Sequence, residues 1–242
     1  AQEYGITREE VDAFAYSSFA KAVAAQQAGF HAGEIVPVVT ETFELEGYAT
    51  RGIKLQGRLT EVALDTHARI SPVEVLAKLR SVYPGGVQTG GNSSALVDAA
   101  AAAVVASGAY ARAEGKKPLA RVVAAAVVGV APEIMGIGPA PAIQLLLERA
   151  GLKLDDIGRF EINEAQGAQT LAVGRELGLD LDKLNVNGGA IALGHPLAAT
   201  GVRLTITLAR ELRRAGLRYG VSSACIGGGQ GIALLLENPD AA

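Results

Sequence analysis

Residues 185–196 read Asn-Val-Asn-Gly-Gly-Ala-Ile-Ala-Leu-Gly-His-Pro, and residues 225–231 read Cys-Ile-Gly-Gly-Gly-Gln-Gly. Each stretch places one reactive side chain, His195 or Cys225, among residues of little bulk. Glycine lets a backbone approach a ligand closely and leaves N–H groups free to bind an oxyanion. Cys225 is also the only cysteine of the chain. The pattern favours a functional role for both side chains over a role in core packing.

The composition of the 242 residues excludes several classes of protein. The net charge is −3 and no basic cluster stands out, so a nucleic-acid-binding surface is not expected. One cysteine cannot form an internal disulfide, no cysteine or histidine cluster has the spacing of a zinc site, and we expect no metal. The apolar runs are too short to span a membrane, and a lone cysteine fits a cytoplasmic protein. The first residue is Ala1 rather than Met, which we interpret as a processed or truncated chain.

The order of the expected elements indicates an α/β fold. Thr7 to Glu10 form a capping box that predicts a helix, and the alanine-rich residues 92–107 are helical by propensity. Residues 42–64 contain three glycines and predict irregular β-structure. From Lys117 onward, strands and helices alternate, which favours a sheet covered by helices on both faces. The strands are expected at residues 119–130, 159–162, 184–186, 218–224 and 231–236.

Three polar residues follow these strands, where α/β sheets bind their ligands. They are Asn163, His195 and Cys225. Elementary chemistry interprets such a set as a cysteine nucleophile with its base and an orienting amide, in a hydrolase or an acyltransferase. For Asn163 and the adjacent Glu164, a plain helix N-cap is an equally good interpretation.

Several motifs together make the chain resemble the thiolases, the family of acyl-CoA C-acyltransferases. Besides the two stretches quoted first, the matching segments are Met-Gly-Ile-Gly-Pro at residues 135–139, Asn-Glu-Ala at 163–165, and Thr-Gly-Gly-Asn-Ser-Ser at 89–94. The resemblance implies a thiolase-like α/β fold with a complete C-terminal βαβαβαββ domain, in which helices flank a mixed sheet. It also implies that residues 1–91 are the remainder of a loop domain, residues 92–116 end the N-terminal domain, and residues 117–242 form the C-terminal domain.

The resemblance also assigns catalytic roles that differ from those of elementary chemistry. Cys225 resembles the acid/base that moves the proton at the substrate α-carbon, and is not the nucleophile. His195 resembles the base that activates the nucleophilic cysteine. Asn163 resembles the residue that positions a water in an oxyanion hole, and Gly227 resembles the N–H donor of a second hole.

Further positions resemble contacts to coenzyme A, which is the expected substrate; no covalently bound cofactor is implied. Ser94 and Ala165 resemble pantetheine contacts, Tyr83 resembles an aromatic residue near the coenzyme, and Arg69 resembles a residue at its nucleotide end. Gln166 stands where most members carry phenylalanine, which changes the pantetheine wall.

No residue matches the family's nucleophilic cysteine, which belongs to an upstream half. We therefore expect an acyltransferase of lipid metabolism and fatty-acid β-oxidation that catalyses reversible thiolysis of 3-ketoacyl-CoA. Its expected partners are its own N-terminal half and further copies of itself, as a dimer or tetramer. Two alternatives stay open: a non-catalytic fragment that binds coenzyme A, and a stand-alone thioester hydrolase that uses Cys225.

Overall fold

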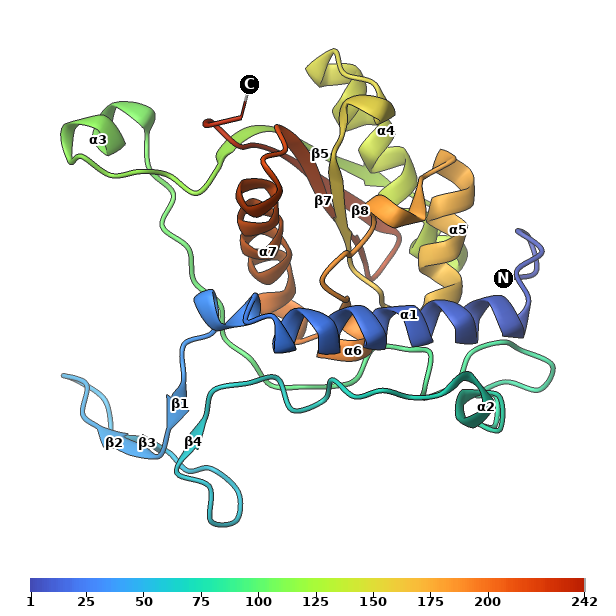
Figure 1. Ribbon diagram of the computed structural model, residues 1–242, viewed down its shortest axis with the longest axis horizontal. Coiled ribbons are helices and arrows are strands. Elements are labelled where there is room, and N and C mark those ends of the chain that lie inside the picture. Colours follow the sequence, from blue (N-terminus) through green and yellow to red (C-terminus); the bar gives the residue numbers. More distant parts are fainter. Residues whose placement is uncertain (242) are drawn as a thin grey trace.

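A computed structural model describes residues 1–241 and contains a four-stranded mixed sheet as its core. The strand order is β5-β8-β7-β6 (Figure 1). The strands are β5 (Arg121–Gly129), β6 (Arg159–Ile162), β7 (Tyr219–Ile226) and β8 (Gln230–Glu237). β6 and β7 are parallel, whereas β8 is antiparallel to both of its neighbours. The mixed sheet expected from the sequence is confirmed.

Helices cover both faces of this sheet, as expected (Figure 1). α7 (Thr200–Ala215) packs on one face, and α4 (Pro139–Ala150) packs on the other, beside α5 (Gly167–Leu177). Successive side chains of a strand point to opposite faces, and β8 follows this rule. Leu235 belongs to the core under α4, while Leu236 belongs to the core under α7.

A long helix, α1 (Arg8–Gln27), crosses the edge of this layered unit and contacts α5 and α6 (Ala190–Leu193) (Figure 1). It begins at the predicted capping box: Glu10 N–H donates to the Thr7 hydroxyl, and Thr7 N–H donates to the Glu10 carboxylate. Its buried side chain Phe19 packs in a cluster with Ile191 of α6.

A buried carboxylate joins α1 to the sheet and to the loop before α6. Glu164 follows β6 and is 1% exposed. It accepts hydrogen bonds from the Ser18 hydroxyl (2.6 Å), the Asn185 side-chain amide (2.8 Å) and the Ile191 N–H (3.1 Å). Burial raises the pKa of Glu164, and the three donors oppose that shift. A Cβ at Gly189 would overlap this carboxyl group, which explains a glycine in the quoted stretch.

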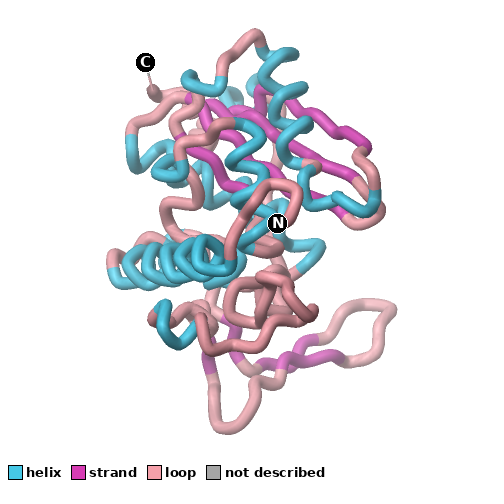
Figure 2. The backbone as a smooth tube through the Cα atoms, turned by 90° about the vertical axis from the view of Figure 1, so that its right-hand side faces the viewer, coloured by secondary structure: helices cyan, strands magenta, loops and turns pink. Residues whose placement is uncertain are grey.

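The first hundred residues add small peripheral elements. Two short antiparallel pairs project away from the sheet, in agreement with the expected irregular β-structure (Figure 2). They are β1 (Val38–Val39) with β4 (Glu61–Val62), and β2 (Glu41–Phe43) with β3 (Arg51–Ile53).

The remaining short elements are spread along the described residues. They are α2 (Val73–Leu76), α3 (Gly108–Ala113) and five 3-10 turns: η1 (His31–Gly33), η2 (Pro132–Ile137), η3 (Leu154–Asp156), η4 (Leu181–Lys183) and η5 (Leu197–Ala199).

The helix predicted over residues 92–107 is wrong. Residues 94–106 have no regular structure and run as a loop to α3 (Figure 1). Leu96, Val104 and Val105 are 92%, 95% and 85% exposed. Helix formation in proteins depends mainly on packing of an apolar face, so alanine propensity alone did not order this segment. The strand predicted at residues 184–186 is reduced to a single bridge between Leu184 and Phe160.

The close approach of the first residues of β8 to Gly138, just before α4, allows a stability test. A Cβ at Gly231 would overlap the carbonyl oxygen of Gly138. Because that atom belongs to the backbone, Gly231→Ala should lower the free energy of unfolding by about 1–3 kcal/mol. Gly129→Ala is the matched control on β5, since its Cβ would meet no atom within 4 Å. Chemical denaturation measures both; equal stability of the two variants would contradict the packing argument.

A second test concerns a carboxyl group buried under α7. Glu161 of β6 is 1% exposed and lies 3.3 Å from the Arg203 guanidinium. Burial raises the pKa of Glu161 to about 8, although Arg203 opposes the shift. The folded state therefore binds this proton more tightly than the unfolded state does. The stability gained from this difference is fully present below the unfolded pKa of 4.5, and it is lost as the pH rises toward the folded pKa of about 8.

Denaturation of Glu161→Gln at several pH values checks this sign. The stability of the wild-type protein should fall relative to the variant between about pH 5 and pH 8, by at most about 1.4 kcal/mol per pH unit. Asp155→Asn, which changes an exposed carboxylate, serves as the control. A constant difference between the wild type and Glu161→Gln across this range would contradict the raised pKa.

Candidate functional site

Two of the predicted site residues lie together because β6 and β7 are parallel neighbours. The carboxyl ends of parallel strands meet at one edge of a sheet, so Asn163, just after β6, lies close to the end of β7, which contains Cys225. The backbone N–H of Asn163 donates to the Ser223 carbonyl at 2.9 Å and extends the ladder by one residue.

Cys225 is enclosed at the end of β7, opposite Gly231 of β8. The side chain is 9% exposed, and this burial raises the pKa of the Cys225 thiol. A thiol of this kind is protonated at neutral pH and is a weak nucleophile.

The glycines after Cys225 serve the turn that joins β7 to β8. Gly228 and Gly229 have φ angles of +87° and +92°, which side chains disfavour. A Cβ at Gly229 would also overlap the Val130 carbonyl oxygen. Gly227 differs from both in having no positive φ; it is exposed, and a Cβ there would meet no atom within 4 Å. Open space therefore lies next to the glycine that was predicted to supply an N–H donor.

Asn163 is fully buried, and neither end of its amide has a partner among the residues that the structure describes. The interpretation of Asn163 and Glu164 as a helix N-cap pair is wrong, because α5 has Gln166 at its N-cap position and no side-chain cap. An unpaired buried polar group costs about 1–3 kcal/mol. Such a group is retained where water, a ligand or another chain pairs with it.

His195 lies in a turn held by its neighbours. Its backbone N–H donates to the Ala95 carbonyl at 3.0 Å, and its Nδ1 is 2.7 Å from the Thr200 hydroxyl. Burial lowers the pKa of His195, and the Arg203 charge lowers it further. The imidazole is therefore neutral at pH 7 and able to accept a proton.

A cavity of about 200 Å³ opens beside Cys225. The predicted residues Ala165 and Gln166 line it as well, and Ser94 is attached to its wall, because both its N–H and its hydroxyl donate to the Ala165 carbonyl at 3.1 and 3.2 Å. The complete lining is Glu133, Met135, Gly136, Ala165, Gln166, Gln169 and Cys225.

Sequence reasoning missed Glu133 and Gln169 as lining residues. A signal for Gln169 was available, because it lies three residues after Gln166, and residues three apart share a helix face. Glu133 stands in the loop between β5 and α4, and only the fold brings it to Cys225.

Tyr83 and Arg69 are not among the residues that line this cavity. Tyr83 is 66% exposed in a turn. The Arg69 guanidinium lies 5.2 Å from the centre of the Phe19 ring and donates to the His67 carbonyl at 3.1 Å. Their predicted contacts to a coenzyme stay predictions.

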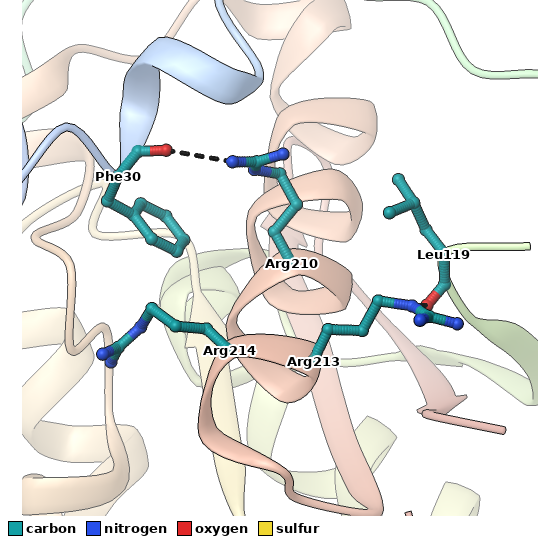
Figure 3. A pocket seen from close by; sticks show the side chains of 5 residues that line it. All are labelled: Phe30, Leu119, Arg210, Arg213 and Arg214. Atoms are coloured by element: carbon teal, nitrogen blue, oxygen red, sulfur yellow. Dashed lines mark hydrogen bonds between the residues drawn. The ribbon is translucent and has the colours of Figure 1, made fainter. Parts of the chain in front are cut away.

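A second cavity, of about 230 Å³, lies against α7 (Figure 3). Phe30, Leu119, Arg210, Arg213 and Arg214 line it. Arg210 donates to the Phe30 carbonyl, and Arg213 donates to the Leu119 carbonyl, as the sticks of Figure 3 show for the first pair. Arg214 is paired with Glu211. Arg210 and Arg213 therefore hold the segments at Phe30 and Leu119 against α7, and the guanidinium groups around this cavity have structural partners.

Residues 1–241 contain neither a cluster of metal-ligating side chains nor a membrane-spanning helix. No group of three or more His, Cys, Asp and Glu side chains in this range could hold a metal ion. Within the same range, no helix is both long and apolar enough to cross a membrane.

The layered fold and the strand-end site define an α/β protein with a buried thiol and an unpaired amide at one sheet edge. Comparison with protein-family models matches residues 116–238 to "Thiolase, C-terminal domain" and residues 1–109 to "Thiolase, N-terminal domain". The chain belongs to the thiolase family.

Individual proteins agree with this assignment. The chain is 45% identical over 239 residues to an acetyl-CoA acetyltransferase of Syntrophomonas wolfei, covering 97% of this chain and 57% of the relative. It is also 45% identical over 241 residues to a beta-ketoadipyl-CoA thiolase of Acinetobacter baylyi, covering 98% of this chain and 57% of the relative. The crystal structure of human mitochondrial 3-ketoacyl-CoA thiolase in complex with CoA matches with a TM-score of 0.85 and 40% identity, covering 98% and 56%. This chain therefore spans little more than half the length of the relatives it matches.

The raised pKa of Cys225 can be tested directly because the chain has one cysteine. Alkylation by iodoacetamide, followed by mass spectrometry over roughly pH 7 to 10, should be slow at neutral pH and reach half its maximum above the ordinary thiol pKa of about 8.5. The same chain in concentrated guanidinium chloride is the control and should react faster. A native midpoint at or below that of the denatured chain would contradict the effect of burial.

Proposed function

We propose that this chain is the acid/base portion of an acyl-CoA C-acyltransferase that cleaves and forms 3-ketoacyl-CoA. The observation that carries the proposal is the juxtaposition of a buried, protonated thiol with a cavity at the sheet edge, where the unpaired amide of Asn163 follows the neighbouring strand. The thiolase family assignment and the names of the relatives support the reaction class.

The proposed chemistry divides between two thiols. In the cleavage direction, a nucleophilic thiolate attacks the 3-keto carbon, and the bond between carbons 2 and 3 breaks. The acyl group stays on the nucleophile as a thioester, and the Cys225 thiol gives its proton to carbon 2 of the leaving acetyl-CoA enolate. The Cys225 thiolate then takes the proton of the coenzyme A thiol, and the resulting coenzyme A thiolate attacks the thioester, takes the acyl group and releases the first cysteine. A thiol that holds its proton at neutral pH suits the acid step.

The other predicted residues fit the charges that develop in this reaction. A neutral His195 can accept the proton of the nucleophilic thiol. Negative charge develops on a carbonyl oxygen in each half-reaction, and such charge needs aimed donors. The unpaired Asn163 amide supports a bound water as one donor, and the open space at Gly227 supports its N–H as another.

Substrate contacts follow from the same cavity. We propose that Ser94, Ala165 and Gln166 contact the pantetheine arm of coenzyme A, since two of them line the cavity and the third is bonded to its wall. Tyr83 is proposed as an aromatic contact near the coenzyme, and Arg69 as a contact at its nucleotide end; both side chains are exposed.

The nucleophilic cysteine is proposed to come from an N-terminal half. Cys225 is the single cysteine here, and the matched relatives are much longer. The bare apolar segment at residues 94–106 supports a covering polypeptide, because such side chains are normally buried. Within this proposal, the loop domain ends in residues 1–91, the N-terminal domain ends in residues 92–116, and residues 117–242 form the C-terminal domain. The whole protein is proposed to work as a homo-oligomer.

The alternative of a hydrolase with Cys225 as nucleophile is disfavoured by the burial and raised pKa of that thiol, since the thiolate is the attacking species. Experiment distinguishes the proposed acyltransferase from the second alternative, a non-catalytic protein that binds coenzyme A.

Thiolysis of acetoacetyl-CoA tests the proposal. The purified 242-residue chain should show no turnover, and activity should appear when the N-terminal part of the Syntrophomonas wolfei relative is fused upstream. In that fusion, Cys225→Ala should lower kcat by about 10²–10⁴-fold, because a general acid/base is lost. Gln27→Ala, at an exposed position on α1, is the control and should retain full activity.

Three outcomes would contradict it in different ways. Robust turnover by the chain alone would remove the need for a second half. Binding of coenzyme A without acyl exchange in the fusion would support the non-catalytic alternative. Mass-spectrometric detection of an acyl group on Cys225 after incubation with acetyl-CoA would support the hydrolase.

A further inference from the structure

The wall of the Cys225 cavity contains a polar group that the proposed mechanism does not use. Gln169, in the first turn of α5, is 9% exposed and lines the cavity. Its Nε2 is buried and has no hydrogen-bond partner among residues 1–241. Buried N–H donors are nearly always paired, so an unpaired one on a side chain that lines a cavity indicates a missing acceptor.

The rest of the Gln169 side chain is held in place. A Cβ at Gly136 would lie 2.8 Å from the Gln169 Cγ, so the glycine leaves room for the stem to pack against the η2 backbone. At the other end, Oε1 lies 3.4 Å from the Thr170 hydroxyl, whose single proton is shared with the Gln166 carbonyl at 3.2 Å. The packed stem therefore fixes the position of the amide group, and its Nε2 has no partner among the described residues.

The chemistry of the lining indicates the kind of acceptor. Of the described residues that line the cavity, Glu133 is the only charged one, and it is negative. A carboxylate or phosphate oxygen would be repelled by Glu133 and would find no cation in the lining. A neutral carbonyl oxygen is compatible with both groups.

We infer that Gln169 is a substrate-binding residue whose Nε2 donates a hydrogen bond to a neutral carbonyl oxygen of a thioester bound beside Cys225. This inference rests on the proposed function. Two kinds of carbonyl in such a ligand have the required chemistry: the amide carbonyls of the pantetheine arm, and the carbonyls of the acyl group. In either case the bond holds the chain of the thioester against α5, next to the Cys225 thiol.

Calorimetric titration with two probes tests the inference and separates the two kinds of carbonyl. The probes are coenzyme A, which carries only the amide carbonyls, and acetoacetyl-CoA, which carries the acyl carbonyls as well. Gln169→Leu should bind acetoacetyl-CoA about five- to tenfold more weakly than the wild type. Equal weakening for both probes assigns a pantetheine amide, and weakening for acetoacetyl-CoA alone assigns a carbonyl of the acyl group.

Controls separate a binding role from a structural one. Gln169→Met removes the donor with little change in volume and should repeat the loss of affinity. Thermal unfolding of both variants without ligand should give a Tm equal to or above that of the wild type, because an unpaired buried donor is removed. Gln27→Leu, at an exposed position, should leave both affinities unchanged.

The inference is overturned if both Gln169 variants bind the two probes within twofold of the wild type, or if they lose stability without losing affinity. Failure of the wild-type chain to bind either probe would instead overturn the proposed function, and the ligand assignment with it.

Discussion

The carboxylate of Glu164 is the interaction on which the arrangement of the site depends. It lies fully inside the protein and accepts from Ser18 of α1, Asn185 after the bridge to β6, and Ile191 of α6. These groups come from segments almost 175 residues apart, and a buried carboxyl without them would be strongly destabilising. Because Glu164 directly follows Asn163, the same bonds fix the end of β6 where the unpaired amide stands.

The glycine-rich stretches have two different physical functions. Gly189 makes room for the Glu164 carboxyl, and Gly229 makes the turn between β7 and β8 possible. Gly227 and Gly228 face open space, and of these two Gly227 has no positive φ that requires a glycine. The glycines therefore serve packing and turn geometry first. Cys225 stands directly before this turn and is buried, and that burial raises the pKa of its thiol.

Sequence patterns predicted the helices and strands well where they are amphipathic or end in clear turns. The capping box at Thr7 and the strands around Cys225 are confirmed. The failure at residues 94–106 has a definite cause: alanine favours a helix by tenths of a kilocalorie per mole per residue, which is too little without a packed face. The adjacency of Asn163 and Cys225 was implied by strand ends, whereas the contribution of Gln169 to the cavity was not anticipated.

The sequence by itself determined the α/β order, the thiolase motifs and the identity of the reactive side chains, because periodicity and short motifs are local properties. Only the tertiary structure decided that Asn163 is unpaired, that Cys225 is buried, and that Glu133 and Gln169 share a cavity with it. The reason is that burial and pairing depend on which distant segments meet. That depends on strand register and helix packing, which no single segment encodes.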